Sequence, residues 1–378
     1  MSRRLFYDFD QIGLNKDKQF VSGDSVLFAR NENCVTFVIA DGMGSGVKAN
    51  ISSIFYSHKL LKLVELGFSR TDSVIKVINE ISSGKIKNSS YVAFNLCRIY
   101  NDGWGSIINY QAPHPIVSSL ESVYVPQYNE RKAGSEKYLE FEVKLNEGDK
   151  LFVFTDGVSQ AGIGVAGVDE WDEKVIASEL SMLNNADRDI GYIVDRVRTI
   201  GGKKVLDDIT VCSLKARYPA IVNIMTGPPK NQTYDNRIVK EFVDLEGYKI
   251  VSGGTTMDIV ARVTGNRISE VSLPDKPYML PEYSIEGIDL CTEGAVTLNR
   301  VFNLLNNRLY EPSDPLLMRF VTYLNLADIV NIYHGRGSNS GHNETHFIEQ
   351  GIVSRQKTVD LITKVLKSSG KIVKTVEY

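Results

Sequence analysis

The chain has 378 residues, with 43 Lys and Arg against 46 Asp and Glu, which gives a formal net charge of −3. At roughly 150 residues per domain, this length predicts two or three domains. Hydrophobic residues make up 43% and charged residues 24%, which excludes a disordered chain. The near balance of charges argues against binding to nucleic acid or to an anionic membrane, since neither attracts the chain as a whole.

The first twenty residues contain no apolar core of a signal peptide, and no apolar run approaches the roughly 18 residues of a membrane span. The four cysteines lie in or beside apolar, strand-like runs and show no C-x-x-C spacing: Cys34, Cys97, Cys212 and Cys291. They are expected to be reduced and buried, neither in disulfides nor at a zinc site. These features predict a cytoplasmic protein.

The first half of the chain is predicted to be rich in strands. The strand candidates are 26–29, 34–40, 91–100, 105–111, 138–144, 151–155 and 209–214. Apolar residues at helical spacing predict helices at 47–64, 71–82, 170–182 and 187–200, and the polar stretch 126–137 is expected to be a loop. This order favours a layered α/β fold with mostly antiparallel sheet over strict βαβ alternation.

A turn-rich stretch from Gly227 to Gln232 accompanies a change in composition. It places a domain boundary near residue 220 and divides the chain into 1–218 and 219–378. Beyond it, helices are predicted at 236–245, 255–263, 293–307, 315–326 and 357–367, and strands at 248–251, 288–290, 328–333 and 371–376. This second part is predicted to be a smaller α/β domain.

Four acidic spots each lie at the tip or flank of a predicted strand: Asp24, Asp41, Asp156 and the pair Asp207-Asp208. A single Asp at such a place is commonly a turn former. Several carboxylates on adjacent strands repel one another unless a cation neutralises them, and oxygen-only ligands favour Mg²⁺ or Mn²⁺. Glycine after Asp41 lets the backbone approach closely, so the Gly42 carbonyl is a further candidate ligand. Two such ions would serve hydrolysis of a phosphate ester.

The glycine-rich turn 41–46 does not match the common nucleotide-binding motifs. Gly42, Gly44 and Gly46 do not fit G-x-G-x-x-G, and Lys48 does not complete G-K-[ST]. A dinucleotide or nucleoside triphosphate site at this turn is therefore disfavoured.

Four runs in this order closely resemble the SpoIIE-like branch of the metal-dependent serine/threonine protein phosphatases (PPM, protein phosphatase type 2C fold). They are SGD at 22–24, ADGMGSG at 40–46 with Ala49 after it, FTDGV at 154–158 and DDITV at 207–211. The resemblance covers about residues 10–216 and implies a β-sandwich flanked by helices. With the smaller α/β domain after it, this is the fold that we expect.

The resemblance also implies roles for the acidic residues. Asp41 would bridge two Mn²⁺ or Mg²⁺ ions, the Gly42 carbonyl would bind one of them, and Asp156 and Asp207 would complete the other ion's shell. Asp24 would hold a metal-bound water. Because two Asp residues are adjacent, either Asp207 or Asp208 is a candidate metal ligand. The family pattern favours Asp207. The implied reaction is attack of a metal-activated water on phosphoserine or phosphothreonine, without a covalent phosphoenzyme.

His114, in the run QAPHP, is a candidate general acid for the leaving alkoxide, and a loop histidine at a turn is the alternative. The resemblance implies a bacterial regulatory phosphoprotein as substrate, of the kind of an anti-sigma-factor antagonist. The sequence does not predict an oligomeric state.

Two alternative functions are also consistent with the sequence. One is an inactive signalling module whose second domain binds a small anionic ligand, and the other is a nucleotide-binding enzyme.

In the second domain, Gly253, Gly254, Thr255 and Thr256 join a strand to a helix, where amides and hydroxyls would cradle an anion. A simple N-cap with a turn is the alternative. Glu293 belongs to a similar strand-to-helix turn, and two such turns would form a binding crevice. Arg336 and the imidazoles of His334, His342 and His346 lie in a Gly- and Ser-rich segment that would suit an anionic ligand. Its H-x-x-x-H spacing lacks the Glu placement of a zinc protease. The whole chain resembles a subgroup of SpoIIE-type phosphatases of anaerobes with a C-terminal extension.

Overall fold

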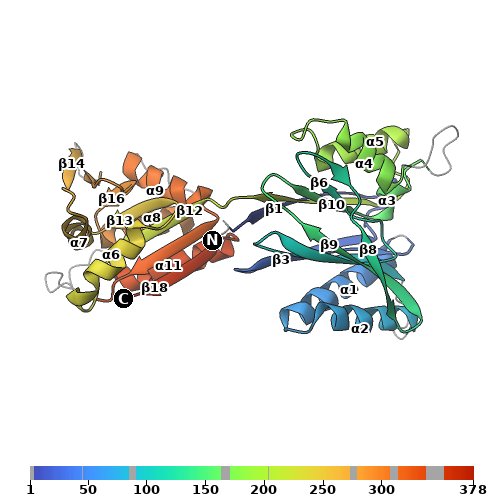
Figure 1. Cartoon of the computed structure of the whole chain (residues 1–378), viewed down its shortest axis with the longest axis horizontal. Helices are drawn as coiled ribbons and strands as arrows, with labels where there is room; N and C mark the ends of the chain where they lie inside the picture. The colour runs from blue at the N-terminus through green and yellow to red at the C-terminus, as the bar shows by residue number, and fades with distance from the viewer. Residues whose placement is uncertain are drawn as a thin grey trace. The chain divides into compact units, whose positions relative to one another are not determined.

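The structure is a computed structural model that describes residues 4–44, 46–84, 91–162, 171–202, 204–272, 279–306, 314–337 and 353–378. The chain divides into two compact units, Met1–Tyr218 and Pro219–Tyr378 (Figure 1). Ser45, His342 and His346 lie outside the described residues. Among the helices that are described, no helix is both long and apolar enough to cross a membrane.

The first unit contains two antiparallel sheets. One sheet has the order β1-β11-β10-β6-β7, and the other has the order β2-β3-β4-β5-β9-β8. The strands are β1 Phe6–Leu14, β2 Asp24–Arg30, β3 Cys34–Gly42, β4 Val92–Tyr100, β5 Trp104–Tyr110, β6 Ile116–Ser118, β7 Val123–Tyr124, β8 Tyr128–Ala133, β9 Glu136–Lys144, β10 Lys150–Phe154 and β11 Ile209–Arg217.

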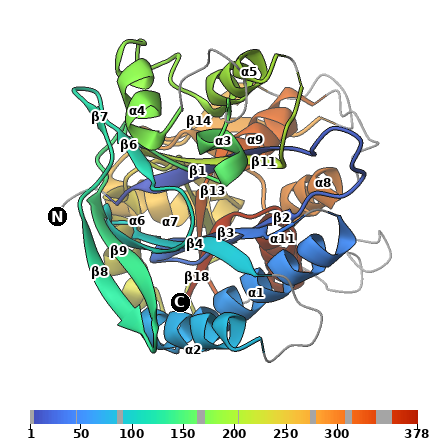
Figure 2. The same cartoon turned by 90° about the vertical axis from the view of Figure 1, so that its right-hand side faces the viewer.

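Helices cover the outer face of each sheet, so the unit has four layers (Figure 2). The helices are α1 Val47–Glu65, α2 Arg70–Ser82, α3 Asp156–Ser159, α4 Glu173–Ser181 and α5 Ile190–Ile200. Helices α1 and α2 pack on the β2–β8 sheet through buried residues such as Tyr56 and Val77, and α4 and α5 pack on the other sheet through Ile176 and Ile193. Between the sheets, Phe37, Phe141 and Leu214 belong to the central core.

Burial on both faces explains why the internal strand β3 is a nearly continuous apolar run. Apolar side chains of β3 point to both of its faces, because one face meets the other sheet and the opposite face meets α1. Local capping explains where several helices begin: the side chains of Ser69, Asp172 and Asp189 accept backbone N–H groups at the starts of α2, α4 and α5.

The second unit is built on one seven-stranded sheet with the order β14-β15-β16-β13-β12-β17-β18. Strands β16, β13, β12, β17 and β18 are parallel, and β14 and β15 add an antiparallel edge. The strands are β12 Ile221–Thr226, β13 Tyr248–Ser252, β14 Ser269–Ser272, β15 Glu282–Ser284, β16 Leu290–Thr292, β17 Ile329–His334 and β18 Ile372–Glu377.

Helices lie on both faces of this sheet. The helices are α6 Asp235–Val243, α7 Gly254–Thr264, α8 Ala295–Asn306, α9 Pro315–Leu326 and α11 Arg355–Ser368, with a short 3₁₀ turn η1 at Gln232–Tyr234. Helices α8, α9 and α11 pack on one face, where Phe320 and Ile362 are buried, and α6 and α7 pack on the other, where Phe242 and Val260 are buried. The parallel strands run in the chain order 3-2-1-4-5, so the sheet is doubly wound.

The structure confirms the predicted fold class of a helix-flanked β-sandwich followed by a smaller α/β unit. All four cysteines are buried and free, as expected. Some local predictions were wrong or missing. Residues 128–133 form strand β8 instead of a loop. Strands β1, β6, β7, β12, β14 and β15 were not predicted.

Candidate metal centre

The carboxylates of Asp24 and Asp41 face one another across two neighbouring strands. In the antiparallel pair β2–β3, Asp24 lies directly opposite Asp41. Opposed residues in such a pair have Cα atoms about 4.5–5.5 Å apart, and like charges at these positions destabilise the pair. The sequence therefore folds two acids into a place where a cation stabilises them.

Asp24 is buried and is held by a hydroxyl from the other sheet. The Thr155 hydroxyl donates to Asp24 Oδ2 at 2.8 Å, and the Thr210 backbone N–H donates to Thr155 Oγ1 at 3.0 Å. The second oxygen, Oδ1, is buried and has no hydrogen-bond partner in the structure. A buried carboxylate oxygen without a donor is costly, so this atom suits a ligand that is not part of the protein.

Of Asp24 and Asp41, Asp41 has the larger shift in pKa. Burial, then the charges of Asp24 and Asp156 and a hydrogen bond with Asp156, raise the pKa of Asp41 to about 9, and Asp207 adds to the effect. Burial likewise raises the pKa of Asp24 to about 6, although hydrogen bonds from Thr210 and Thr155 oppose the shift. Three of the predicted acids, Asp24, Asp156 and Asp207, therefore act on the carboxyl group of Asp41.

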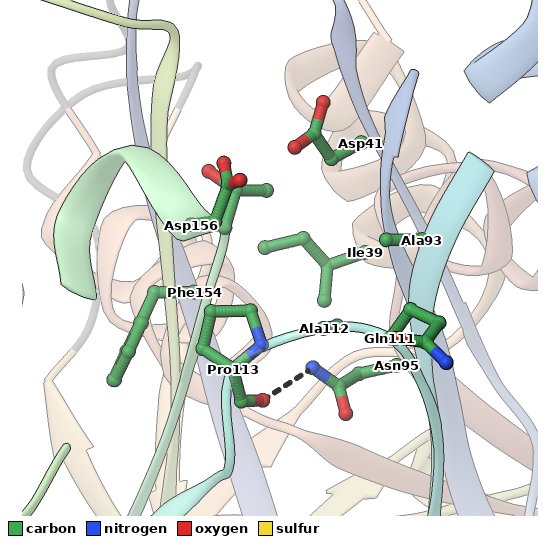
Figure 3. A pocket seen from close by; sticks show the side chains of 10 residues that line it. Ile39, Asp41, Ala93, Asn95, Gln111, Ala112, Pro113, Phe154 and Asp156 are labelled. Atoms are coloured by element: carbon green, nitrogen blue, oxygen red, sulfur yellow. Dashed lines mark hydrogen bonds between the residues drawn. The ribbon is translucent and has the colours of Figure 1, made fainter. Parts of the chain in front are cut away.

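Asp41 and Asp156 both line a small pocket between the two sheets. The pocket is lined by Ile39, Asp41, Ala93, Asn95, Gln111, Ala112, Pro113, Phe154, Thr155 and Asp156. Figure 3 shows the carboxylates of Asp41 and Asp156 on the same side of this pocket, above Asn95 and Pro113. Asp156 reaches this place because β10 ends at Phe154 and helix α3 begins at Asp156.

The two acids of the 207–208 pair differ in their contacts. Asp208 is buried, and its two oxygens accept the backbone N–H groups of Lys16 at 2.8 Å and Gly23 at 2.6 Å. Asp207 is about half exposed, and its nearest cation is Lys16 Nζ at 3.6 Å. This difference favours Asp207 as the ligand and gives Asp208 the task of fixing the turn that precedes Asp24.

Glycine is required at position 42 for steric reasons. A Cβ atom there would lie 2.2 Å from the backbone oxygen of Ala49, in the first turns of α1. The Gly42 N–H donates to the Gly23 carbonyl at 3.2 Å, which ties the turn after β3 to the turn before β2. The candidate ligand Gly42 and the acid Asp24 are thus held close together by backbone contacts.

His114 does not lie among the residues that line the pocket. Its imidazole packs against the rings of Tyr128 and Phe141, with centroids 5.3 and 5.4 Å away, and its backbone N–H donates to Glu173. This placement corrects the assignment of His114 as a general acid and favours the loop-histidine alternative, because the ring packs on aromatic side chains outside the pocket.

Sequence reasoning missed Thr155, Asn95 and Gln111, which the structure brings to the pocket. Asn95 and Asn109 hold the loop 111–113 by donating to the Pro113 carbonyl at 3.1 and 3.0 Å. Gln111 has a positive φ of 55°, which is uncommon outside glycine. Only Thr155 had a sequence signal, its place directly before Asp156.

The donor set fits divalent cations. It contains carboxylate and carbonyl oxygens, the chemistry that Mg²⁺ and Mn²⁺ prefer, and it includes the unpartnered Asp24 Oδ1. Within the described residues, no three His, Cys, Asp or Glu side chains are gathered closely enough to form a metal shell by themselves.

Sequence comparison matches residues 31–217 to the family model of Stage II sporulation protein E (SpoIIE). The N-terminal unit belongs to the SpoIIE family. That family has a phosphatase domain of the PP2C type, a class that generally depends on metal ions. No curated protein matches the chain in sequence.

Solved structures similar to the chain include three structures of two bacterial proteins. The PP2C phosphatase domain of SpoIIE from Bacillus subtilis with a fragment of its regulatory domain is 20% identical, covering 57% of this chain and 64% of that one, with a TM-score of 0.49. A second structure of the Bacillus subtilis SpoIIE phosphatase domain is 19% identical, covering 58% and 95%, with a TM-score of 0.46. The RsbU and RsbW domains of Rv1364c from Mycobacterium tuberculosis are 16% identical, covering 63% and 68%, with a TM-score of 0.48.

The predicted ligand residues of the second unit have partners within the protein. The Gly253 N–H donates to the Thr292 carbonyl, and Thr256 Oγ1 accepts the Gly227 N–H, both at 2.8 Å. Gly254 and Thr255 lie exposed at the start of α7, and Glu293 accepts the Ser252 hydroxyl through its backbone oxygen at 2.8 Å. These bonds favour the simple cap and turn. Arg336 forms an ion pair with Glu377, and both side chains are about half exposed, so this contact leaves its assignment to an anion a prediction.

Proposed function

We propose that the protein is a metal-dependent phosphatase that hydrolyses phosphoserine and phosphothreonine in a protein substrate. The observation that carries the proposal is the opposition of Asp24 and Asp41, with Asp156 and Asp207 close enough to raise the pKa of Asp41. Membership of the N-terminal unit in the SpoIIE family supports the same reaction.

In this proposal, Asp41 and the Gly42 carbonyl would hold one divalent cation, and Asp41, Asp156 and Asp207 would hold a second. Bound Mn²⁺ or Mg²⁺ would supply positive charge for the phosphoryl oxygens and would lower the pKa of water. The protein's own task is positioning: Thr155 fixes Asp24, Asp208 fixes the turn at Gly23, and Asn95 and Asn109 fix the pocket loop.

The proposed substrate is a phosphorylated bacterial regulatory protein of the kind of an anti-sigma-factor antagonist, as the family resemblance implies. The cations supply the positive charge that meets the phosphate, so a net charge of −3 is no obstacle to such a substrate. We further propose that the second unit, residues 219–378, regulates the phosphatase or binds a ligand.

The test is release of phosphate from phosphoserine and phosphothreonine peptides by the full chain, with Mn²⁺ or Mg²⁺ and with EDTA. The proposal expects turnover with metal only, and a loss of at least 100-fold in Asp41→Asn, since one ligand of both ions is removed. Absence of turnover with every metal would contradict the proposal and favour the inactive signalling module. Equal rates in wild type and Asp41→Asn would exclude the assigned site.

A further inference from the structure

A row of polar side chains crosses the carboxyl edge of the second sheet. In the register of the parallel strands, Thr292, Ser252, Thr226 and His334 are neighbours in that order. All four are buried, and the three hydroxyl residues are fully inaccessible. A hydrophobic core does not require such a row, because a buried polar group costs free energy unless it is hydrogen-bonded.

The row continues the face that α8, α9 and α11 cover. Val222 and Ile224 of β12 and Ile332 of β17 belong to the core beneath these helices, and Thr226 and His334 follow two residues later on the same strands. Side chains two apart in a strand share a face. The row therefore lies on the side of the sheet where α8 and α11 pack.

Among the described residues, two fully buried threonines on this side of the unit have hydroxyls without a hydrogen-bond partner. Thr226 Oγ1 ends β12, and Thr297 Oγ1 lies in the first turn of α8; both residues are fully buried. By contrast, the Ser252 and Thr292 hydroxyls both donate to the Glu293 backbone oxygen, at 2.8 and 3.0 Å. The unpartnered pair needs an acceptor that the described residues do not supply.

A guanidinium from α11 lies beside the same strand ends. Arg355 Nη2 donates to the carbonyls of Gly335 and Gly337, both at 3.0 Å, and its Nε is buried without a partner. A Cβ atom built on Gly227 would lie 2.4 Å from Arg355 Cζ, so the group lies close to the end of β12. In the described part of the chain, no carboxylate forms an ion pair with Arg355. A partly buried guanidinium with a buried, unpartnered Nε and no counter-ion favours an anion.

These groups meet where the winding of the sheet reverses. The chain enters the sheet at β12 and continues on one side to β13 and β16, and on the other side to β17 and β18. Ligands of doubly wound sheets bind outside the carboxyl ends of the two strands at this reversal, here β12 and β17. Asn299 of α8 bonds both backbone groups of Val353, which holds the starts of α8 and α11 together.

We propose that the carboxyl ends of β12 and β17, with the first turns of α8 and α11, form a binding site for the phosphate group of a small molecule. Thr226, Thr297 and Arg355 would donate to it, and the two helix N-termini would add partial positive charge. Ligand entry requires the 335–337 segment, which Arg355 holds by two hydrogen bonds, to move away from the row. The site does not depend on the phosphatase reaction.

The test uses the full chain in EDTA, so that divalent cations bind neither unit, with inorganic phosphate and AMP as separate probes. Calorimetry is expected to show saturable binding, weakened at least tenfold in Thr226→Val and in Arg355→Gln. Thr226→Val should leave the stability of the free protein unchanged or higher, because it removes a buried hydroxyl that has no partner. Stronger binding of AMP than of phosphate would identify a nucleotide as the source of the phosphate group; the reverse would identify the free ion.

The matched control is Thr358→Val, whose hydroxyl in the first turn of α11 already donates to the Ser354 carbonyl at 3.0 Å. It should keep wild-type binding. Absence of binding by both probes, or equal affinities in wild type, Thr226→Val and Arg355→Gln, would overturn the proposal. Thr226→Val keeps the test valid if Arg355→Gln does not fold.

Discussion

Asp24 and Asp41 lie directly opposite one another on β2 and β3, and only Asp24 Oδ2 is held by a hydroxyl from the other sheet. The two carboxyl groups lie at the end of the β-sandwich where β10 ends and Asp156 begins helix α3. This relationship links the fold of the N-terminal unit to the proposed metal chemistry, because it is unfavourable in the absence of a cation.

The first prediction concerns the stability of the metal-free protein. The pKa values of Asp24 and Asp41 are raised in the fold to about 6 and about 9, above their ordinary value of 3.8. Between pH 4 and 9 the folded state therefore binds more protons than the unfolded state, so the free energy of unfolding falls as the pH rises. Urea unfolding in EDTA should show the free energy of unfolding fall by about 5 kcal/mol between pH 5 and pH 8, at roughly 1.36 kcal/mol per pKa unit.

Added Mn²⁺ should reverse that loss at pH 8, since the cation takes the place of the protons. Asp24→Asn should weaken the pH dependence of the free energy of unfolding. The control Asp10→Asn, at an exposed position, should leave it unchanged. A free energy of unfolding that increases from pH 5 to pH 8 in EDTA would show that the pKa values of Asp24 and Asp41 are not raised in the folded protein.

The second prediction separates the neighbours Asp207 and Asp208. Asp207→Asn should abolish most metal-dependent turnover while it leaves the unfolding transition in EDTA nearly unchanged, because Asp207 is half exposed. Asp208→Ala should destabilise the N-terminal unit by about 1–3 kcal/mol, because the buried N–H groups of Lys16 and Gly23 lose their acceptor. The reverse pattern in the two measurements would exchange the two assignments.

The third prediction concerns Gly42. Gly42→Ala should destabilise the unit and weaken Mn²⁺ binding, because the added Cβ would overlap the Ala49 carbonyl and push α1 away from the turn. Gly13→Ala, in β1, is the control, since its Cβ would meet its nearest neighbour at 3.8 Å. Equal stability of the two variants in urea would argue against the close approach.

The fourth prediction tests the corrected role of His114. His114→Phe should retain turnover within about threefold and should keep the same pH profile, because the ring packs on Tyr128 and Phe141 outside the pocket. A general acid contributes roughly 100-fold or more. A loss of that size, with an altered alkaline limb of the pH profile, would restore the catalytic assignment.

Much of the first unit was predictable because its motifs are local. Asp41, Asp156 and Asp207 each stand at the end or start of an apolar strand run, and the family pattern orders them. Strand β1 escaped prediction although Tyr7 and Phe9, which pack toward the core, alternate with the polar Asp8 and Asp10, because Asp is uncommon in strands. Residues 128–133 escaped because five of the six side chains are exposed, so the strand carries no apolar pattern.

In the second unit, the sequence did not predict strand β12 or the residues of the proposed phosphate site. Strand β12 adjoins the Gly- and Pro-rich turn that suggested a linker, yet it is the central strand of the parallel sheet. Thr226, Thr297 and Arg355 are far apart in the sequence and carry no motif. Only the register of the strands and the packing of α8 and α11 bring them to one edge, and these are non-local contacts.

The most direct test of the central claim is calorimetric titration of the metal-free full chain with Mn²⁺, for wild type and for Asp41→Asn. The account predicts saturable binding of two ions to wild type and a loss of at least one of them in the variant, because Asp41 is assigned to both. Binding of the same number of ions with the same affinity to both proteins would contradict the assignment, and so would an absence of Mn²⁺ binding by the folded wild-type chain.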